Sequence, residues 1–188
     1  MKNRLEIHPE PLEKRGKVFI AIIVFGIILM WSFGIYAYLT LPQKIPGHFD
    51  LKGNPTRYDD KLSFLIITLI LSGVSSGFLF ITKWRFKLFN RSPYLLNLTW
   101  SFQQQIENIP HERKAFWLNR YFENLLIVDI FLTYSFLAME YGMYISDISG
   151  KLPLWFIFFI FLFPLLIIIL TLASFKKLSN LMKKETFT

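Results

Sequence analysis

The sequence predicts an all-α, polytopic membrane protein with four transmembrane helices, and three observations favour this class. Of the 188 residues, 53% are hydrophobic, and the mean hydropathy is +0.40. Charged residues make up only 18%, whereas soluble domains contain roughly 25%. Four stretches reach the roughly 20 apolar residues that a helix needs to cross the hydrocarbon core. A soluble fold could not bury this much apolar surface, so the composition excludes a disordered chain and argues against a soluble enzyme.

The four apolar stretches define the domain organisation. They are bounded by charged residues, Pro or Gly, such as Lys17, Pro42 and the pair Lys176–Lys177. We expect a cytoplasmic tail at 1–17, a single four-helix membrane domain at 18–175 and a basic cytoplasmic tail at 176–188. Within that domain the predicted spans are 18–41, 62–82, 125–145 and 154–175.

The basic residues predict the orientation of the spans. With four spans, the two tails and the middle loop lie on one side and carry 16 Lys and Arg, while the other side carries 5. Basic residues concentrate on the cytoplasmic side of membrane proteins. We therefore expect both termini in the cytoplasm of a multi-pass cell-membrane protein. The net charge of +8 is explained in this way without a nucleic-acid partner.

The middle loop contains an amphipathic segment at 84–120. Apolar residues such as Leu96, Trp100 and Phe116 are flanked there by basic ones, and Pro110 interrupts the pattern. This pattern is typical of helices that lie on a membrane surface. The segment is either a scaffold on the cytoplasmic face or a docking platform for a cytoplasmic protein partner.

The segment 42–61, between the first two spans, is predicted to be an ordered outer loop. Pro42 and Pro46 restrict the chain to extended geometry, and Gly47 and Gly53 permit turns. His48 lies in this loop. A single imidazole is a poor metal site, so His48 either makes a structural hydrogen bond or contacts a ligand.

The sequence of this outer loop resembles that of a known family. The pattern L-P-x-x-I-P-x-H-F, with a Gly soon after and a Lys before the next span, is similar to the bacterial membrane family called domain of unknown function 1648. A Phe-Asn-x-x-Pro element at Phe89, Asn90 and Pro93 adds to the likeness. The outer-loop pattern is carried by Leu41, Pro42, Ile45, Pro46, His48, Phe49, Gly53 and Lys61.

The resemblance implies a protein of the bacterial cell envelope. Described relatives are the SdpI-type immunity proteins, which protect producer cells from a secreted antimicrobial peptide and have further spans that this chain has no room for. Members usually carry Asp three residues after the loop Gly, where this chain has Thr56; Asp59 and Asp60 are close in sequence. The resemblance and the loop chemistry together predict ligand-binding residues at Pro46, His48, Phe49, Gly53 and Lys61.

Two acids inside the third span form a second candidate site. Asp129 and Glu140 are eleven residues apart, close to three whole helical turns, so both lie on one face together with Thr133. Charged groups in a bilayer cost roughly 2.5–3.5 kcal/mol and usually face the bundle interior. The acids form either a proton or cation path, or a buried pair bonded to small polar residues of the second span.

Gly73 and Gly77 form a G-x-x-x-G step in the second span. Such a step lets two helices approach closely. We expect helix packing there, with another span of the same chain favoured over a second copy.

No catalytic motif is present, cysteine is absent, and the three His are scattered. We therefore expect no enzyme, no cofactor and no metal site. The leading hypothesis is immunity or protection against an antimicrobial peptide, or ligand sensing, through a secreted peptide or a lipid bound at the outer face. The alternative is a small transporter, or a transporter accessory subunit, that uses Asp129 and Glu140.

Overall fold

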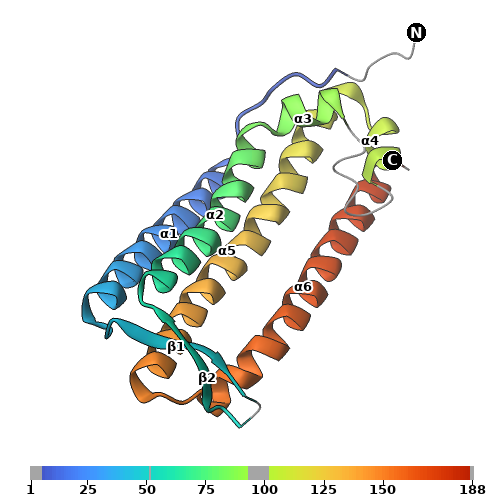
Figure 1. The fold of residues 1–188 in the computed structure, drawn as a ribbon. Helices are drawn as coiled ribbons and strands as arrows, with labels where there is room; N and C mark the ends of the chain where they lie inside the picture. Colours follow the sequence, from blue (N-terminus) through green and yellow to red (C-terminus); the bar gives the residue numbers. More distant parts are fainter. Residues whose placement is uncertain (1–5, 51, 93–101, 187–188) are drawn as a thin grey trace. The chain divides into compact units, whose positions relative to one another are not determined.

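The computed structural model describes residues 6–50, 52–92 and 102–186. The predicted helical class is confirmed, and the segment 42–61 is ordered as two strands, which the sequence analysis did not foresee. In chain order (Figure 1) the elements are α1 (Lys14–Thr40), β1 (Lys44–Phe49), β2 (Pro55–Asp60), α2 (Leu62–Lys83), α3 (Arg85–Arg91), α4 (Phe102–Glu107), α5 (His111–Ser149) and α6 (Leu154–Thr186).

Helices α1, α2, α5 and α6 are long and apolar enough to cross a membrane, which confirms the four predicted spans. Much of their apolar surface is exposed, most of all on α6, where Leu154 is 74% and Phe161 is 70% exposed. Monomeric soluble proteins rarely leave apolar patches of this extent in water. Lipid tails are as apolar as these side chains, so the exposed faces of the four helices fit a bilayer.

Helix α5 is longer than the predicted third span, because it begins at His111 rather than at about Leu125. Pro110 precedes its first residue, and the Pro110 carbonyl accepts a hydrogen bond from the Arg113 amide at 2.9 Å. Proline suits a helix start because its missing N–H would have no partner there. The added turns carry several charged residues, so hydropathy alone does not include them in the span.

The chain forms two compact units, which are described separately. The terminal unit comprises Met1–Ala21, Gly77–Val128 and Ile168–Thr188. The hairpin unit comprises Ile22–Ser76 and Asp129–Ile167. Each long helix contributes one part to each unit.

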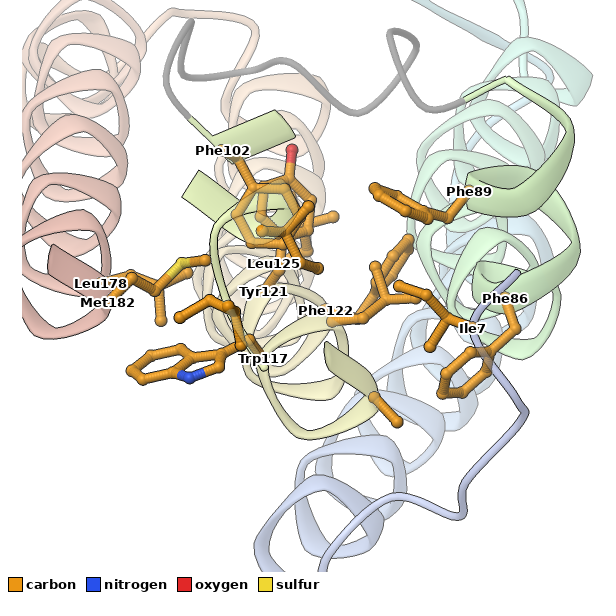
Figure 2. Packing of buried hydrophobic residues seen from close by; sticks show 14 of the residues in the cluster. Ile7, Phe86, Phe89, Phe102, Trp117, Tyr121, Phe122, Leu125, Leu178 and Met182 are labelled. Carbon is orange, nitrogen blue, oxygen red and sulfur yellow. The ribbon is translucent and has the colours of Figure 1, made fainter. Parts of the chain in front are cut away.

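The terminal unit has a large aromatic core (Figure 2). The Tyr121 ring lies at its centre, with ring centroids of Phe102 at 4.4 Å and Phe175 at 5.0 Å. Phe89 and Ile106 are also buried there. Withdrawing a side chain of this size from water contributes about 1.5–3 kcal/mol, so this core fixes α3 and α4 against α5 and α6.

This core corrects the prediction for the segment 84–120. Phe86 and Phe89 of α3, and Phe102 and Ile106 of α4, are buried in the protein core instead of facing a membrane surface. The reason is that α5 and α6 extend beyond the predicted apolar spans and offer apolar partners of their own. Pro93 and the predicted apolar positions between Tyr94 and Trp100 lie outside the described residues.

The predicted tails also take part in the terminal unit. Leu178 and Met182 of α6 are buried in the aromatic core, and so is Ile7. The Asn90 side chain fixes the N-terminal segment, because its Oδ1 accepts from the Ile7 amide at 3.0 Å and its Nδ2 donates to the Ile7 carbonyl at 2.9 Å. Residues near both ends of the chain therefore help to hold α3 and α6 in place.

Arg85 joins three parts of the terminal unit. Its guanidinium donates to Asn119 Oδ1 at 2.6 Å, to the Thr82 carbonyl at 2.9 Å and to the Glu10 carbonyl at 2.6 Å. Burial lowers the pKa of Arg85, and the nearby Glu123 carboxylate opposes this effect. The three acceptors satisfy a charge that would otherwise be costly to bury.

The hairpin unit contains an antiparallel pair of strands between α1 and α2. Lys44 pairs with Asp60 at one end and Phe49 pairs with Pro55 at the other, and the register is irregular around His48. Ile45 packs into a small core with Ala37 of α1, Leu41 directly after that helix and Phe64 of α2. The predicted order of the outer loop thus comes from strand pairing as well as from its prolines.

Candidate functional site

A pocket of about 560 Å³ lies between the hairpin and the helices of its unit. Strand β1 contributes Pro46, His48 and Phe49 to its lining, and α2 contributes Phe64. The remaining lining from α5 and α6 is mostly apolar, with Met139, Met143, Phe156 and Ile160. Concave sites lined mainly by apolar side chains, with a few polar groups, are typical of small-ligand binding.

Three of the five predicted ligand-binding residues line this pocket: Pro46, His48 and Phe49. The other two have structural contacts. Gly53 adopts a φ of +79°, and its carbonyl accepts a hydrogen bond from the Leu152 amide at 3.0 Å. Lys61 places its ammonium 4.8 Å from the centre of the Tyr38 ring.

The tip of the hairpin is fixed to the α5–α6 connection (Figure 1) through the bond between Gly53 and Leu152. The Asp50 carboxylate accepts the amides of Asn54 at 2.8 Å and Lys52 at 2.9 Å. The bond from the Asn54 amide is the main reason that the pKa of Asp50 lies below its ordinary value. This turn holds β1 in place, and with it His48 and Phe49.

Asp59 and Asp60, which lie close to Thr56, have different roles. The Asp59 carboxylate lines the pocket and pairs with Arg57 at 2.7 Å. Asp60 accepts the Leu62 amide at 2.9 Å at the start of α2, and this bond is the main reason that its pKa is lowered. Asp59 is therefore the acid of this pair that a ligand in the pocket can reach.

Asp147 is a pocket residue that the sequence analysis did not identify. It lies on α5, is only 9% exposed and lines the pocket. Among the described residues, nothing forms a hydrogen bond to its Oδ2. The sequence does contain an indication of this residue. Asp147 lies 18 residues after Asp129, which is about five whole helical turns, so the two acids share one face of the helix.

Asp129 and Thr133 lie against α2 in the same unit. Both side chains are fully buried, and Thr133 Oγ1 is 2.8 Å from Ser75 Oγ and 3.5 Å from Asp129 Oδ1. Within the described part of the chain, Asp129 Oδ2 has no hydrogen-bond partner. The structure thus places this acid beside small polar residues of the second span.

Glu140 is fully buried as well, two to three turns further along α5. Thr68 of α2 lies beside its carboxyl group. Neither Glu140 Oε1 nor Oε2 has a hydrogen-bond partner within residues 6–50, 52–92 and 102–186. Buried carboxyl oxygens without partners are uncommon in folded proteins and mark a candidate site for a proton or a cation.

The glycines that allow close approach are not those predicted. A Cβ on Gly34 would lie 2.7 Å from Thr68 Oγ1, and one on Gly26 would lie 2.6 Å from Thr133 Cγ2. A Cβ on Gly73 or Gly77 would meet no atom within 4 Å, and both glycines are exposed. The prediction that Gly73 and Gly77 pack against another span of this chain is therefore wrong.

The fold and the pocket define the class as a multi-pass helical membrane protein with an ordered hairpin between its first two spans. The family model described as "Domain of unknown function (DUF1648)" matches residues 25–71. A protein of Archaeoglobus fulgidus, named "Uncharacterized protein", is 37% identical over 172 residues, which are 90% of this chain and 93% of the relative. The chain belongs to the DUF1648 family, as its outer-loop pattern predicted. No solved structure matches the chain.

The matched region contains the hairpin, with parts of α1 and α2 on either side. It includes the pocket residues Pro46, His48 and Phe49, whereas Asp129 and Asp147 lie outside it. The similar protein is archaeal, so membership of the family does not restrict the chain to bacteria. The relation to SdpI-type immunity proteins remains a prediction.

The glycine contacts lead to a matched test of helix packing. Gly34→Ala should lower the midpoint of thermal unfolding in detergent, because the new methyl group overlaps Thr68 and overpacking costs about 1–3 kcal/mol. Gly73→Ala should leave the midpoint unchanged or raise it, because the space around Gly73 is open. If the wild-type protein forms a dimer and Gly73→Leu abolishes it, Gly73 contacts a second copy of the chain, which is the alternative to packing within the chain. Equal stability of the two Ala variants would contradict the packing described.

Proposed function

We propose that this protein binds an amphipathic ligand, a secreted peptide or a lipid, in the hairpin pocket, and that this binding serves protection or sensing at the cell envelope. The observation that carries the proposal is the presence of two kinds of group in one pocket. His48 and Phe49 of the family motif lie there together with Asp147, whose Oδ2 has no partner among the described residues.

The chemistry of the lining indicates the kind of ligand. Phe49, Phe64 and Phe156 offer an apolar surface, while His48 can donate or accept a hydrogen bond. As a carboxylate, Asp147 gains a partner from a ligand that brings a hydrogen-bond donor or a positive charge. A peptide with apolar side chains and a basic group fits both requirements, and the resemblance to SdpI-type immunity proteins supports a peptide.

Rigidity of the hairpin supports binding. The Gly53–Leu152 bond and the Asp50 turn fix β1 before any ligand arrives. A site that is already ordered loses less conformational entropy when it binds. The proposal requires neither a metal nor a catalytic group, and we propose a non-enzymatic role.

A growth assay tests the proposal. Cells that express the chain should tolerate a secreted antimicrobial peptide of the same species, and His48→Ala and Asp147→Asn should each lower the tolerated concentration roughly three- to tenfold, the effect of one hydrogen bond. Lys52→Ala, on the exposed hairpin tip, is the control and should have no effect. All variants should be present in the membrane at wild-type abundance. Unchanged tolerance at normal abundance would reject the pocket as the recognition site.

The proposed role also requires the hairpin to face outward. The count of 16 basic residues against 5 supports an orientation with the hairpin on the side opposite the termini, outside the cell. Reporter fusions at Gly53 should therefore score as external, and fusions after Lys184 as cytoplasmic. A cytoplasmic signal from the Gly53 fusion would overturn the orientation and, with it, recognition of a secreted ligand.

A second candidate function, ion- or proton-coupled transport, is favoured by the acids of α5. Asp129, Glu140 and Asp147 lie on one face of the helix, and each has at least one buried oxygen without a partner among the described residues. In this proposal, a proton or a small cation that moves along this face would supply the missing partner to each acid in turn.

Flux measurements separate transport from ligand binding. In vesicles with a trapped pH-sensitive dye, the full chain should dissipate a proton gradient, and Asp129→Asn or Glu140→Gln should abolish the flux, because the amide cannot accept and release a proton. Glu112→Gln makes the same change at an exposed position of α5 and should keep the flux. Gradients that decay no faster than in empty vesicles, or full flux in both buried variants, would reject transport by this route.

A further inference from the structure

The terminal unit contains a second pocket, of about 830 Å³, between the ends of its long helices. Five basic side chains line it, and they come from α1, α5 and α6: Arg15, Arg113, Arg120, Lys177 and Lys184. This concentration of positive charge has no counterpart in the hairpin pocket, where Arg57 pairs with Asp59.

Carboxylates neutralise only part of this charge. Arg113 makes two bonds to Glu185, at 2.9 and 3.2 Å. Arg120 pairs with Glu13 at 3.2 Å and with Glu123 at 3.3 Å, and Arg15 also pairs with Glu123. These three arginines thus share three carboxylates. Lys177, which is exposed on α6, has no acidic partner among the described residues.

Two of the guanidinium groups are held in place by one aromatic ring. The Arg113 guanidinium lies 4.1 Å from the centre of the Phe116 ring, and that of Arg120 lies 4.9 Å from it. Such contacts stabilise a cation, but they also keep two like charges close together. An anion bound beside them would relieve this repulsion, and guanidinium groups match the oxygens of a phosphate.

The other part of the pocket is apolar. Ile127, Leu178 and Leu181 belong to its lining. Further along α6 in the same unit, Leu172 and Ile169 are 60% and 63% exposed. Charge at one end and an exposed apolar face at the other match a molecule with an anionic head and hydrocarbon tails.

We infer that this pocket binds the phosphate headgroup of an anionic phospholipid, with the acyl chains along the exposed face of α6. Basic pockets between membrane helices are known sites for such headgroups. The depth agrees, because the basic lining of α6 begins at Lys177, immediately after the apolar run of its span. This site is independent of the hairpin pocket and of the function proposed for it.

Lipid retention by the full chain tests the inference. The purified protein, in a neutral detergent, is titrated with phosphatidylglycerol or with phosphatidylcholine, and bound lipid is counted by native mass spectrometry. Phosphatidylglycerol should bind at least about tenfold more tightly than phosphatidylcholine. Lys177→Gln should weaken phosphatidylglycerol about fivefold, the effect of one basic residue near an anionic headgroup.

Lys176→Gln is the matched control, because it removes the same charge from the adjacent residue, which does not line the pocket. Both lysines are exposed, so neither variant should disturb folding. An equal loss in the two variants would mean diffuse surface attraction and would overturn the site. Equal binding of the two lipids would overturn it as well.

A titration with inorganic phosphate distinguishes a site for a lipid headgroup from a site for a soluble phosphate. Because the apolar part of the pocket contributes only to lipid binding, phosphate should displace phosphatidylglycerol only at a large excess. Thermal unfolding in the presence of phosphate alone should change little. If phosphate stabilises the protein as much as the lipid does, and Lys177→Gln removes that effect, the pocket is a site for a soluble anion and the lipid inference is wrong.

Discussion

The structure depends on one constraint: hydrocarbon offers no hydrogen-bond partner, so a polar group inside a span must find its partner within the chain. Helix α5 carries such groups along one face, and α2 provides small hydroxyl side chains as their partners. The hydroxyl oxygens of Thr133 and Ser75, for example, are 2.8 Å apart. Small partners require close helices. Gly26 and Gly34 remove the side chains that would hold α1 away, so the packing of the hairpin unit follows from the polar face of α5.

The two units differ in how far their buried charged groups meet this constraint. In the terminal unit, the buried carboxylate of Glu123 is ion-paired through Oε2 with Arg15 and Arg120, although its Oε1 has no hydrogen-bond partner among the described residues. The buried Arg85 has three acceptors. In the hairpin unit, Glu140 and Asp147 also keep carboxyl oxygens without hydrogen-bond partners, and, unlike Glu123, they form no ion pair with the described Lys and Arg residues. Paired charges hold a structure together. Buried groups without partners lower the stability of the fold, and such groups are typical of sites that a ligand or an ion uses. This contrast directs the functional proposals to the acids of the hairpin unit.

The spans and the family motif could be predicted from the sequence, because both depend on residue type and order alone. The strands could not, since the β1 sequence KIPGHF has no alternating pattern, contains a single β-branched residue, Ile45, and includes Pro46 and Gly47, which are uncommon in strands. Its pairing depends on a turn fixed by Asp50 and by Leu152 on the α5–α6 connection. The G-x-x-x-G spacing indicated a helix-packing step at Gly73 and Gly77 but could not show that this face of α2 is exposed. Asp147 was missed because it follows the predicted end of the third span, although its helical phase matches that of Asp129.

Charge is divided between the units in a way that links orientation to ligand preference. The terminal unit carries 16 basic and 7 acidic residues, whereas the hairpin unit carries 5 basic and 6 acidic ones. A chain whose orientation is set by basic residues on one side necessarily gathers cations at the ends of its helices there. Where α1, α5 and α6 bring those ends together, as around Phe116, the same residues form a pocket for an anion. The hairpin pocket is lined by Asp59 and Asp147 against one arginine, Arg57, which agrees with the opposite preference that we propose for it, a ligand with a donor or a positive charge.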